Sequence, residues 1–159
     1  MKTQIKINGE PTVWCAQHDE NTLQPANARA YELASFSGAE SVGILQMLME
    51  INNPSPEIIH SIKSAMKWLD EHKLTGIKVE NQPGADGKRN MVVVADPSAP
   101  PLLARFYDLE TGKPFFCDRD GIKKSSLAEI GDERRNGYSW YSSGFEGLKK
   151  KYEQWVGKP

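Results

Sequence analysis

Residues 103–141 read LARFYDLETGKPFFCDRDGIKKSSLAEIGDERRNGYSWY, and they interleave arginines with Phe, Tyr and Trp residues. A guanidinium is a planar fork that grips a carboxylate or phosphate with two parallel hydrogen bonds, and an aromatic ring offers a flat face to a sugar or a base. The pattern therefore indicates a site for an extended anionic ligand. The structural alternative is a β-rich edge of the core, where the arginines pair with nearby Asp and Glu residues of the same segment.

Two parts of this segment, ARFYDLETGKPFFCDRDG and ERRNGYSWY, resemble the closing segment of the pectate lyases of polysaccharide lyase family 10. Three earlier stretches, VWCAQHD, ARAYE and SFSGAESVGILQMLM, resemble the middle segment of the same family in the same order. The family's catalytic module is considerably longer, and this chain resembles only its C-terminal half. We therefore expect a truncated pectate lyase module that forms a single domain over residues 1–159.

The composition is that of a soluble globular protein, with 38% hydrophobic residues, 26% charged residues and a net charge of −1. Residues 1–100 carry 9 Lys/Arg against 12 Asp/Glu, and residues 101–159 carry 11 against 9, so the positive half contains the arginine–aromatic segment. The overall charge argues against a nucleic-acid partner, although aromatic rings and arginines could stack bases. No transmembrane run is present, so no membrane partner is expected. The resemblance implies a secreted or extracytoplasmic protein, although the chain shows no signal peptide.

The helical signals begin at Ser37, which starts a capping box before the apolar run 42–51, and the wide apolar arc of that run predicts a buried helix. Ser55 followed by Pro56 begins a second helix after a short break, which favours a helical hairpin. Residues 145–155 predict a final amphipathic helix. With the resemblance, these signals imply a mainly α fold with short β-strands, part of an (α/α) toroid-like arrangement of helical hairpins plus small β-hairpins.

Short strands are expected beside turn signals. Asn8 and Gly9 indicate one hairpin, residues 105–109 and 114–117 indicate another, and residues 91–95 predict a buried strand. The two cysteines, at positions 15 and 117, lie inside apolar runs and form either one disulfide or two buried thiols.

The chemistry implied by the resemblance is β-elimination of polygalacturonate, which carries a carboxylate on every sugar. A base removes the proton on C5, the glycosidic oxygen leaves from C4, and negative charge gathers on the carboxylate in an enolate-like intermediate. Such a site must place a base near C5 and neutralise the carboxylate with calcium, with arginine or with both.

The resemblance implies that the base is an arginine, and Arg29 in ARAYE is the residue that matches. By its reference pKa an arginine is a very poor base, so neighbouring cations would have to make its neutral form accessible. The structural alternative is an ion pair between Arg29 and Glu32, three residues further on.

Arg119, in DRDG, best matches a clamp for a substrate carboxylate, and its structural alternative is pairing with Asp118 or Asp120. Arg134 is preferred to Arg135, since consecutive residues of a helix point about 100° apart. The remaining substrate-binding candidates are Arg105, Arg134, Tyr31 and Asp19. Next to Asp19, His18 is either half of an acid/base or metal pair, or a structural histidine.

Calcium is the cofactor that the resemblance implies, but its ligands remain unknown. Asp86 and Asp96 lie in or beside loops, and nothing in the sequence sets the roughly six to eight oxygen ligands that calcium prefers. In the family, the calcium carboxylates come chiefly from the part that this chain does not resemble.

Three functions follow from these observations. The first is a truncated pectate lyase that uses Arg29 and Arg119, with calcium held largely by the carboxylates of the substrate. The second is a non-catalytic galacturonan-binding remnant, and the third is one half of a split lyase. Because half of a toroid would leave apolar helix faces uncovered, self-association or a companion chain is a further expectation.

Overall fold

The computed structural model describes residues 1–84, 87 and 89–157. Within this part of the chain the helices are α1 (Gly38–Leu48), α2 (Pro56–His72), α3 (Asp132–Gly137) and α4 (Phe145–Val156), together with the 3-10 turn η1 (Leu127–Glu129). The strands are β1 (Lys6–Ile7), β2 (Glu10–Pro11), β3 (Phe36–Ser37), β4 (Ile77–Pro83), β5 (Arg89–Ala95), β6 (Leu103–Ala104), β7 (Phe106–Tyr107), β8 (Phe116–Cys117), β9 (Lys123–Lys124) and β10 (Tyr141–Ser142).

The strands form small antiparallel sheets of two strands each, which pair β1 with β2, β3 with β7, β4 with β5, β6 with β10, and β8 with β9. Two of these pairs join distant parts of the chain, because β3 meets β7 and β6 meets β10. In the β3–β7 pair, Phe36 lies opposite Tyr107 and Ser37 lies opposite Phe106. The loop that precedes β3 is thereby held against the arginine–aromatic segment.

The prediction of a mainly helical, toroid-like fold is wrong. Helix accounts for 32% of the described residues and strand for 23%, and no toroid of helical hairpins is present among them. Most of the strands are only two residues long, so the alternation of apolar and polar residues that marks a strand cannot repeat within them. Aromatic side chains and turn residues, rather than helix periodicity, organise the chain between α2 and α4.

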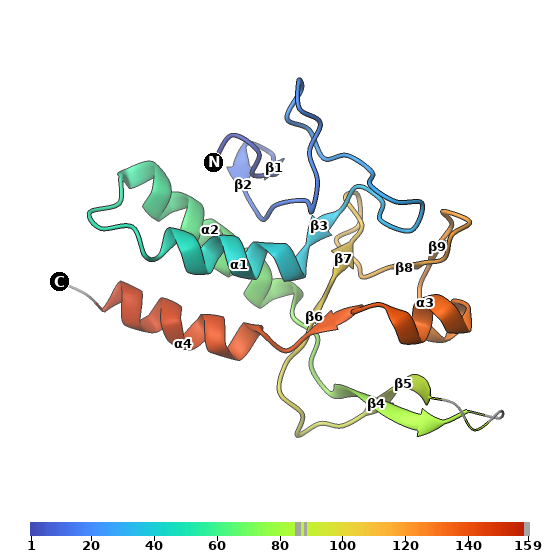
Figure 1. Cartoon of the computed structure of the whole chain (residues 1–159). Coiled ribbons are helices and arrows are strands. Elements are labelled where there is room, and N and C mark those ends of the chain that lie inside the picture. Colours follow the sequence, from blue (N-terminus) through green and yellow to red (C-terminus); the bar gives the residue numbers. More distant parts are fainter. Residues whose placement is uncertain (85–86, 88, 158–159) are drawn as a thin grey trace.

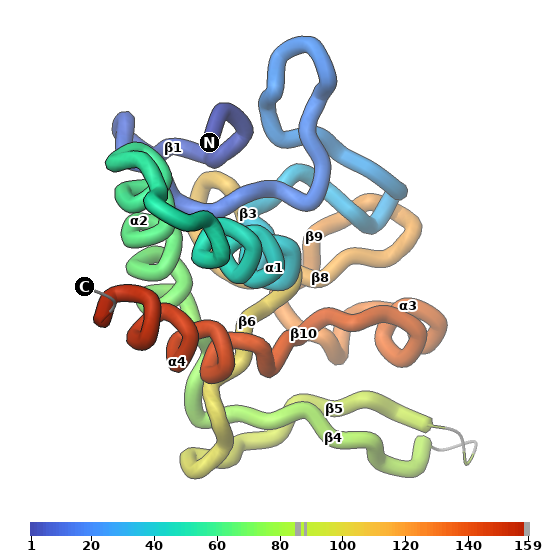
Figure 2. The backbone as a smooth tube through the Cα atoms, turned by 60° about the vertical axis from the view of Figure 1, so that its left-hand side comes forward, coloured from blue at the N-terminus to red at the C-terminus, as the bar shows by residue number. Residues whose placement is uncertain are grey.

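The helices and the small sheets occupy different regions of the molecule. Helices α1, α2 and α4 lie together on one side, and α3, β8 and β9 lie on the opposite side (Figure 1). The β4–β5 hairpin projects beneath α3 and β10, as Figure 2 also shows. None of the described helices is long and apolar enough to cross a membrane.

Two hydrophobic clusters form the core. The first lies among α1, α2 and α4 and includes the fully buried Leu45, Leu69 and Leu148. The second is largely aromatic, and its buried members are Tyr31, Phe106, Phe115, Phe116, Cys117, Leu127, Ile130 and Trp140. Burial of these large rings supplies most of the apolar area in this region. The polar groups described below therefore pack against a buried aromatic cluster.

Several local predictions are confirmed. The Ser37 hydroxyl accepts a hydrogen bond from the Glu40 backbone N–H at 3.2 Å, and the Ser55 hydroxyl accepts one from the Ile58 N–H at 3.4 Å. Both serines therefore begin their helices as expected. The Asn8–Gly9 turn joins β1 to β2, with positive φ angles of 52° and 87°.

Other local predictions need correction. Strand β5 forms, but it is not buried, because its two-stranded sheet leaves Val93 exposed. The buried face of the run 42–51 is narrower than predicted, since Ile44 is only half-buried and Ile51 is exposed beyond the end of α1. The predicted turn between residues 105–109 and 114–117 does form, because the Phe115 N–H donates to the Phe106 carbonyl at 3.2 Å and Tyr107 bridges Pro114, but the sheet partner of β7 is β3 and not β8. Both cysteines are buried free thiols, so they do not form a disulfide.

Candidate active site

The candidate site is built on two tyrosines that meet edge to face. The ring centroids of Tyr31 and Tyr138 lie 5.3 Å apart with an interplanar angle of 81°. Tyr31 is buried in the loop before β3, and Tyr138 follows α3 directly. Tyr138 also stacks on the buried Phe106, at 6.2 Å between centroids. The two tyrosines are therefore part of the aromatic cluster.

Four arginines surround this tyrosine pair. The Cζ atoms of Arg134, Arg29 and Arg119 lie 4.5, 5.0 and 5.9 Å from the centroid of the Tyr31 ring. The Cζ atom of Arg105 lies 4.8 Å from the centroid of Tyr138. Such contacts between a cation and an aromatic face are attractive. The structure thus brings Tyr31 and all four predicted arginines together from four separate segments.

The backbone of each segment explains why these side chains converge. A tight turn, in which the Glu32 N–H donates to the Arg29 carbonyl at 2.7 Å, places Arg29 and Glu32 side by side. A second turn carries Arg119, and Gly121 closes it with a φ angle of 72°. The N–H of Gly131, just before α3, donates to the carboxylate of Asp118 at 2.6 Å. This bond ties the Arg119 turn to the start of α3, which carries the next part of the site.

Buried groups fix the other two arginines. The indole N–H of Trp140 donates to the carbonyl oxygen of Arg134 at 2.9 Å. The backbone N–H of Arg105 donates to the carbonyl oxygen of Trp140 at 2.8 Å, and the Arg105 carbonyl accepts from the Gly38 N–H at 3.2 Å. The backbones of Arg105 and Arg134 are therefore both bonded to Trp140, a buried member of the aromatic cluster.

Each arginine already holds a carboxylate. Arg29 binds Glu32 with both arms of its fork, at 2.7 Å from Nε to Oε2 and 2.5 Å from Nη2 to Oε1. The Nη2 atom of Arg105 donates to Oε1 of Glu40 at 2.5 Å. The structural alternative predicted for Arg29 is thus present.

Arg119 and Arg134 share one carboxylate. Their Nη2 atoms donate to Oε1 of Glu133 at 2.6 and 2.9 Å. The structural alternative for Arg119, a pair with Asp118 or Asp120, is not present, because those carboxylates accept from backbone N–H groups instead. Glu133 lies 14 residues beyond Arg119, so only the fold brings the two together. Glu133 is nevertheless one of the acids of residues 103–141 that could pair with the arginines, and this broader structural alternative is confirmed for Arg119 and Arg134.

The pairs differ in how firmly they are held. The side chain of Glu32 is only 12% exposed, and it also accepts a 2.6 Å hydrogen bond from the Tyr138 hydroxyl. The hydrogen bond from Arg29 lowers the pKa of Glu32 to about 2, and the same bond raises the pKa of Arg29 above its ordinary value. Burial, and then the bond to Glu32, raises the pKa of Tyr138. In this state Arg29 is held in its charged form.

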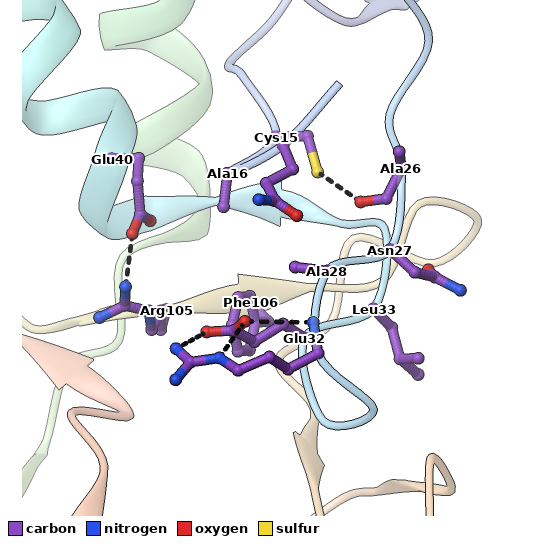
Figure 3. Close-up of a pocket in the computed structure, with 12 residues that line it drawn as sticks. Cys15, Ala16, Ala26, Asn27, Ala28, Glu32, Leu33, Glu40, Arg105 and Phe106 are labelled. Atoms are coloured by element: carbon purple, nitrogen blue, oxygen red, sulfur yellow. Dashed lines mark hydrogen bonds and ion pairs between the residues drawn. The ribbon is translucent and has the colours of Figure 1, made fainter. Parts of the chain in front are cut away.

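A pocket of about 560 Å³ opens beside the arginines (Figure 3). Glu32, Glu40 and Arg105 contribute charge to it, and Phe106 contributes an aromatic edge. Among the described residues, the buried Nε–H groups of Arg105 and Arg134 have no hydrogen-bond partner. Both atoms are covered by the protein, as is the equally unpartnered Nε–H of Arg135, so the charged surface that a ligand could contact is the pocket lining, which includes Arg29 and Arg105.

The comparisons with known proteins agree with this geometry. A family model described as pectic acid lyase matches residues 1–148. This chain belongs to the pectic acid lyase family. A family 10 polysaccharide lyase from Cellvibrio cellulosa is 36% identical with a TM-score of 0.83, over 98% of this chain and 47% of that chain. A mutant of a family 10 polysaccharide lyase from the same organism, in complex with trigalacturonic acid, is 37% identical with a TM-score of 0.82, over 99% of this chain and 48% of that chain.

This member of the pectic acid lyase family therefore spans about half the length of the solved enzymes that it matches. A search of the curated proteins found no match. The resemblance to family 10 pectate lyases, first indicated by the motifs, is confirmed by both the family match and the structural match.

Asp19 does not join the site of this pectic acid lyase family member. Its Oδ1 atom accepts from the backbone N–H groups of Asn21 and Thr22, so it closes the turn of its own loop. These bonds lower the pKa of Asp19, the one from Thr22 most strongly. His18 contacts the carbonyl oxygen of Leu23 at 3.2 Å. Both observations favour the structural interpretation of this pair.

Two residues of the site, Glu40 and Tyr138, were not predicted from the sequence, apart from the place of Glu40 in the capping box that Ser37 starts. Their partners are distant in the chain, since Glu40 lies 65 residues from Arg105 and Tyr138 lies 106 residues from Glu32. The only available signal was their position inside the stretches that resemble the family.

The described residues do not fit a calcium cage. In that part of the chain, no three His, Cys, Asp or Glu side chains gather into a group that could hold a metal ion. Asp96 binds Ser98 and pairs with Lys78 at 3.2 Å, and the predicted candidate Asp86 lies outside the described residues. Calcium thus stays a prediction of the resemblance.

Proposed function

We propose that this chain binds de-esterified polygalacturonate and cleaves it by β-elimination, with Arg29 as proton acceptor and Arg119 as carboxylate clamp. The observation that carries the proposal is the convergence of four guanidiniums on the Tyr31–Tyr138 pair, beside a pocket of about 560 Å³. Membership of the pectic acid lyase family supports the reaction class. The complex of a solved relative with trigalacturonic acid supports the substrate class.

The arginines suit the charge that develops in this reaction. Removal of the C5 proton moves negative charge onto the neighbouring carboxylate, and preorganised donors aimed at that charge lower the barrier. Arg105 and Arg134 contribute positive charge beside the tyrosine pair, and both are anchored through Trp140. Arg119 is exposed and forms a planar fork that matches a carboxylate. These residues bind and orient the uronate and stabilise the enolate-like intermediate.

The proton acceptor has to change its partner before it can act. Glu32 holds Arg29 in the charged form, which has no lone pair available for a proton. Repulsion between Arg29 and Arg119 works in the opposite direction: the hydrogen bond to Glu133 raises the pKa of Arg119, and the charge of Arg29 lowers that pKa by a smaller amount. We infer that Arg29 accepts the C5 proton only when substrate has loosened its contact with Glu32.

The second candidate function is galacturonan binding without cleavage, and the Arg29–Glu32 pair favours it. A site whose arginines are all charged binds carboxylates but has no base. Completion of the site by a companion chain or by a second copy is part of the same proposal, as is an extracytoplasmic location. Size-exclusion chromatography with light scattering measures the assembly state directly.

The deciding experiment measures ultraviolet absorbance of the unsaturated product on polygalacturonate, together with binding of the polymer. Wild-type protein is assayed with added calcium and with chelator, and highly methylated pectin serves as the matched ligand control. A lyase produces absorbance, whereas a binding module retains de-esterified polymer and produces none. Equal retention of de-esterified and methylated pectin contradicts both functions, because esterification removes the charge that the arginines recognise.

A further inference from the structure

One carboxylate of the protein sits where a ligand carboxylate would be expected. Oε1 of Glu133 accepts from Nη2 of Arg119 at 2.6 Å and from Nη2 of Arg134 at 2.9 Å, and Oε2 accepts from Nε of Arg119 at 3.2 Å. Both guanidiniums lie over the face of Tyr31. The two arginines and the ring form a cradle for a carboxylate, and we call it the Glu133 cradle.

We propose that Glu133 is an internal competitor that occupies a uronate subsite, and that a carboxylate of the substrate displaces it. This inference rests on the proposed function, since it takes the displacing ligand to be galacturonan. It assigns a role in ligand selection to a residue that makes no contribution of its own to binding the polymer.

Exposure decides which of the carboxylates in the site can be exchanged. The side chains of Glu133 and Arg119 are 63% and 64% exposed, so their ion pair lies in water and contributes little to stability. Glu133 can therefore turn into solvent at small cost. Glu32 cannot do so, because it is nearly buried and bonded to the Tyr138 hydroxyl. Arg134 is 13% exposed and stays in place when Glu133 leaves.

Acid does not release this competitor at ordinary pH. The hydrogen bond from Arg119 lowers the pKa of Glu133 to about 2. The carboxylate is therefore ionised under any mild condition, and displacement by another anion is the way to empty the cradle. Because the Glu133 carboxylate is always charged and accessible, its affinity for Arg119 and Arg134 sets how strongly it competes with substrate.

The length of the ligand decides how much binding free energy remains after Glu133 has been displaced. A single uronate that enters the Glu133 cradle replaces one carboxylate with another, so it gains little binding free energy. A chain of uronates can also reach Arg29 and Arg105, which line the pocket, and its second contact is made within a ligand that is already bound. Displacing Glu133 lowers the affinity of every uronate ligand by the same factor, so a monomer is left with little binding and a de-esterified polymer is retained by its additional contacts.

The test compares Glu133→Gln with wild type in equilibrium binding of de-esterified polygalacturonate at low salt. Without the competing charge, we expect binding about three- to tenfold tighter, since the energy of an exposed ion pair corresponds to a change of this size in the dissociation constant. Glu129→Gln is the matched control, because it removes the same charge from a nearby exposed residue that bonds to Ser125 instead. The control should stay within about twofold of wild type, and circular dichroism verifies the fold of each variant.

A second background separates local competition from a general charge effect. In an Arg119→Ala protein, the gain from Glu133→Gln should shrink, because half of the cradle has been removed. The inference is overturned if Glu133→Gln does not bind the polymer more tightly, or if it gains the same affinity in both backgrounds. The proposed function still stands in these cases, provided that the wild-type protein binds the polymer. If neither wild type nor Glu133→Gln binds the polymer, both proposals are overturned. Binding that appears only in Glu133→Gln supports the competitor.

Discussion

Replacing Glu32 by Gln measures how strongly the Arg29–Glu32 pair stabilises the fold. The hydrogen bond from Arg29 lowers the pKa of Glu32 from 4.5 to about 2, and each pKa unit corresponds to about 1.4 kcal/mol. The full shift would thus contribute about 3 kcal/mol, but the Arg29 side chain is 64% exposed and water screens the pair. We expect Glu32→Gln to lower the free energy of unfolding by about 1–2 kcal/mol, which corresponds to a Tm lower by roughly 3–6 °C.

The pH dependence provides the sharper part of this prediction. Because the folded pKa of Glu32 lies below the unfolded value, its contribution is complete above the unfolded pKa and is lost as pH falls through the folded pKa. The difference between wild type and Glu32→Gln should be full at about pH 7 and should approach zero near about pH 2. At that acidity a protonated Glu32 and a glutamine are nearly isosteric.

Urea denaturation followed by circular dichroism at several pH values provides the measurement. Glu133→Gln is the control, because its ion pair is exposed and its loss should leave Tm almost unchanged. A difference between wild type and Glu32→Gln that persists undiminished in acid would show that the glutamate acts through packing or shape. Equal stability at neutral pH would show that the pair contributes nothing to the fold.

Four further predictions concern activity, packing and ligand length. Arg29→Ala should lower kcat about 30- to 1000-fold in the product-absorbance assay and leave polymer binding within about threefold. Arg119→Ala should weaken both binding and rate, and Arg119→Lys should restore little in the same two assays, because an ammonium lacks the planar fork. Gly38→Ala should cost about 2–4 kcal/mol in urea denaturation, since its Cβ would lie 2.2 Å from the carbonyl oxygen of Ala104. In calorimetric titrations, digalacturonate should bind markedly better than the monomer; equal affinities would contradict a second uronate contact in the site.

The local features of this chain were predictable because they depend on neighbouring residues. Ser37 and Ser55 begin helices through contacts within three residues, and Asn8–Gly9 forms its turn through its own backbone preferences. The family motifs also pointed to the arginines that converge on Tyr31. Those motifs are long, so they identify a region of the fold even when the role of each residue remains open.

The long-range features were not predictable in the same way. The pairing of β3 with β7 joins strands of two residues that are about 70 positions apart, so no periodic pattern marks it. The partners of Arg119 and Arg105 lie 14 and 65 residues away, and nearby acids such as Asp118 were the more obvious choice. Backbone N–H groups bind those nearby acids instead, since Asp120 accepts from Ile122 within its own turn and Asp118 accepts from Gly131 at the start of α3.

The charge balance of the site explains why a uronate polymer, rather than a single uronate, is the ligand it suits. Among the described residues, the four guanidiniums around the tyrosine pair are paired with three carboxylates, those of Glu32, Glu40 and Glu133. One positive charge is therefore in excess before any ligand binds. A first galacturonate that displaces Glu133 leaves that excess unchanged, and only a second carboxylate on the same chain neutralises it. Because the first exchange is nearly neutral and the second is a net gain, binding free energy accumulates from the second sugar onward.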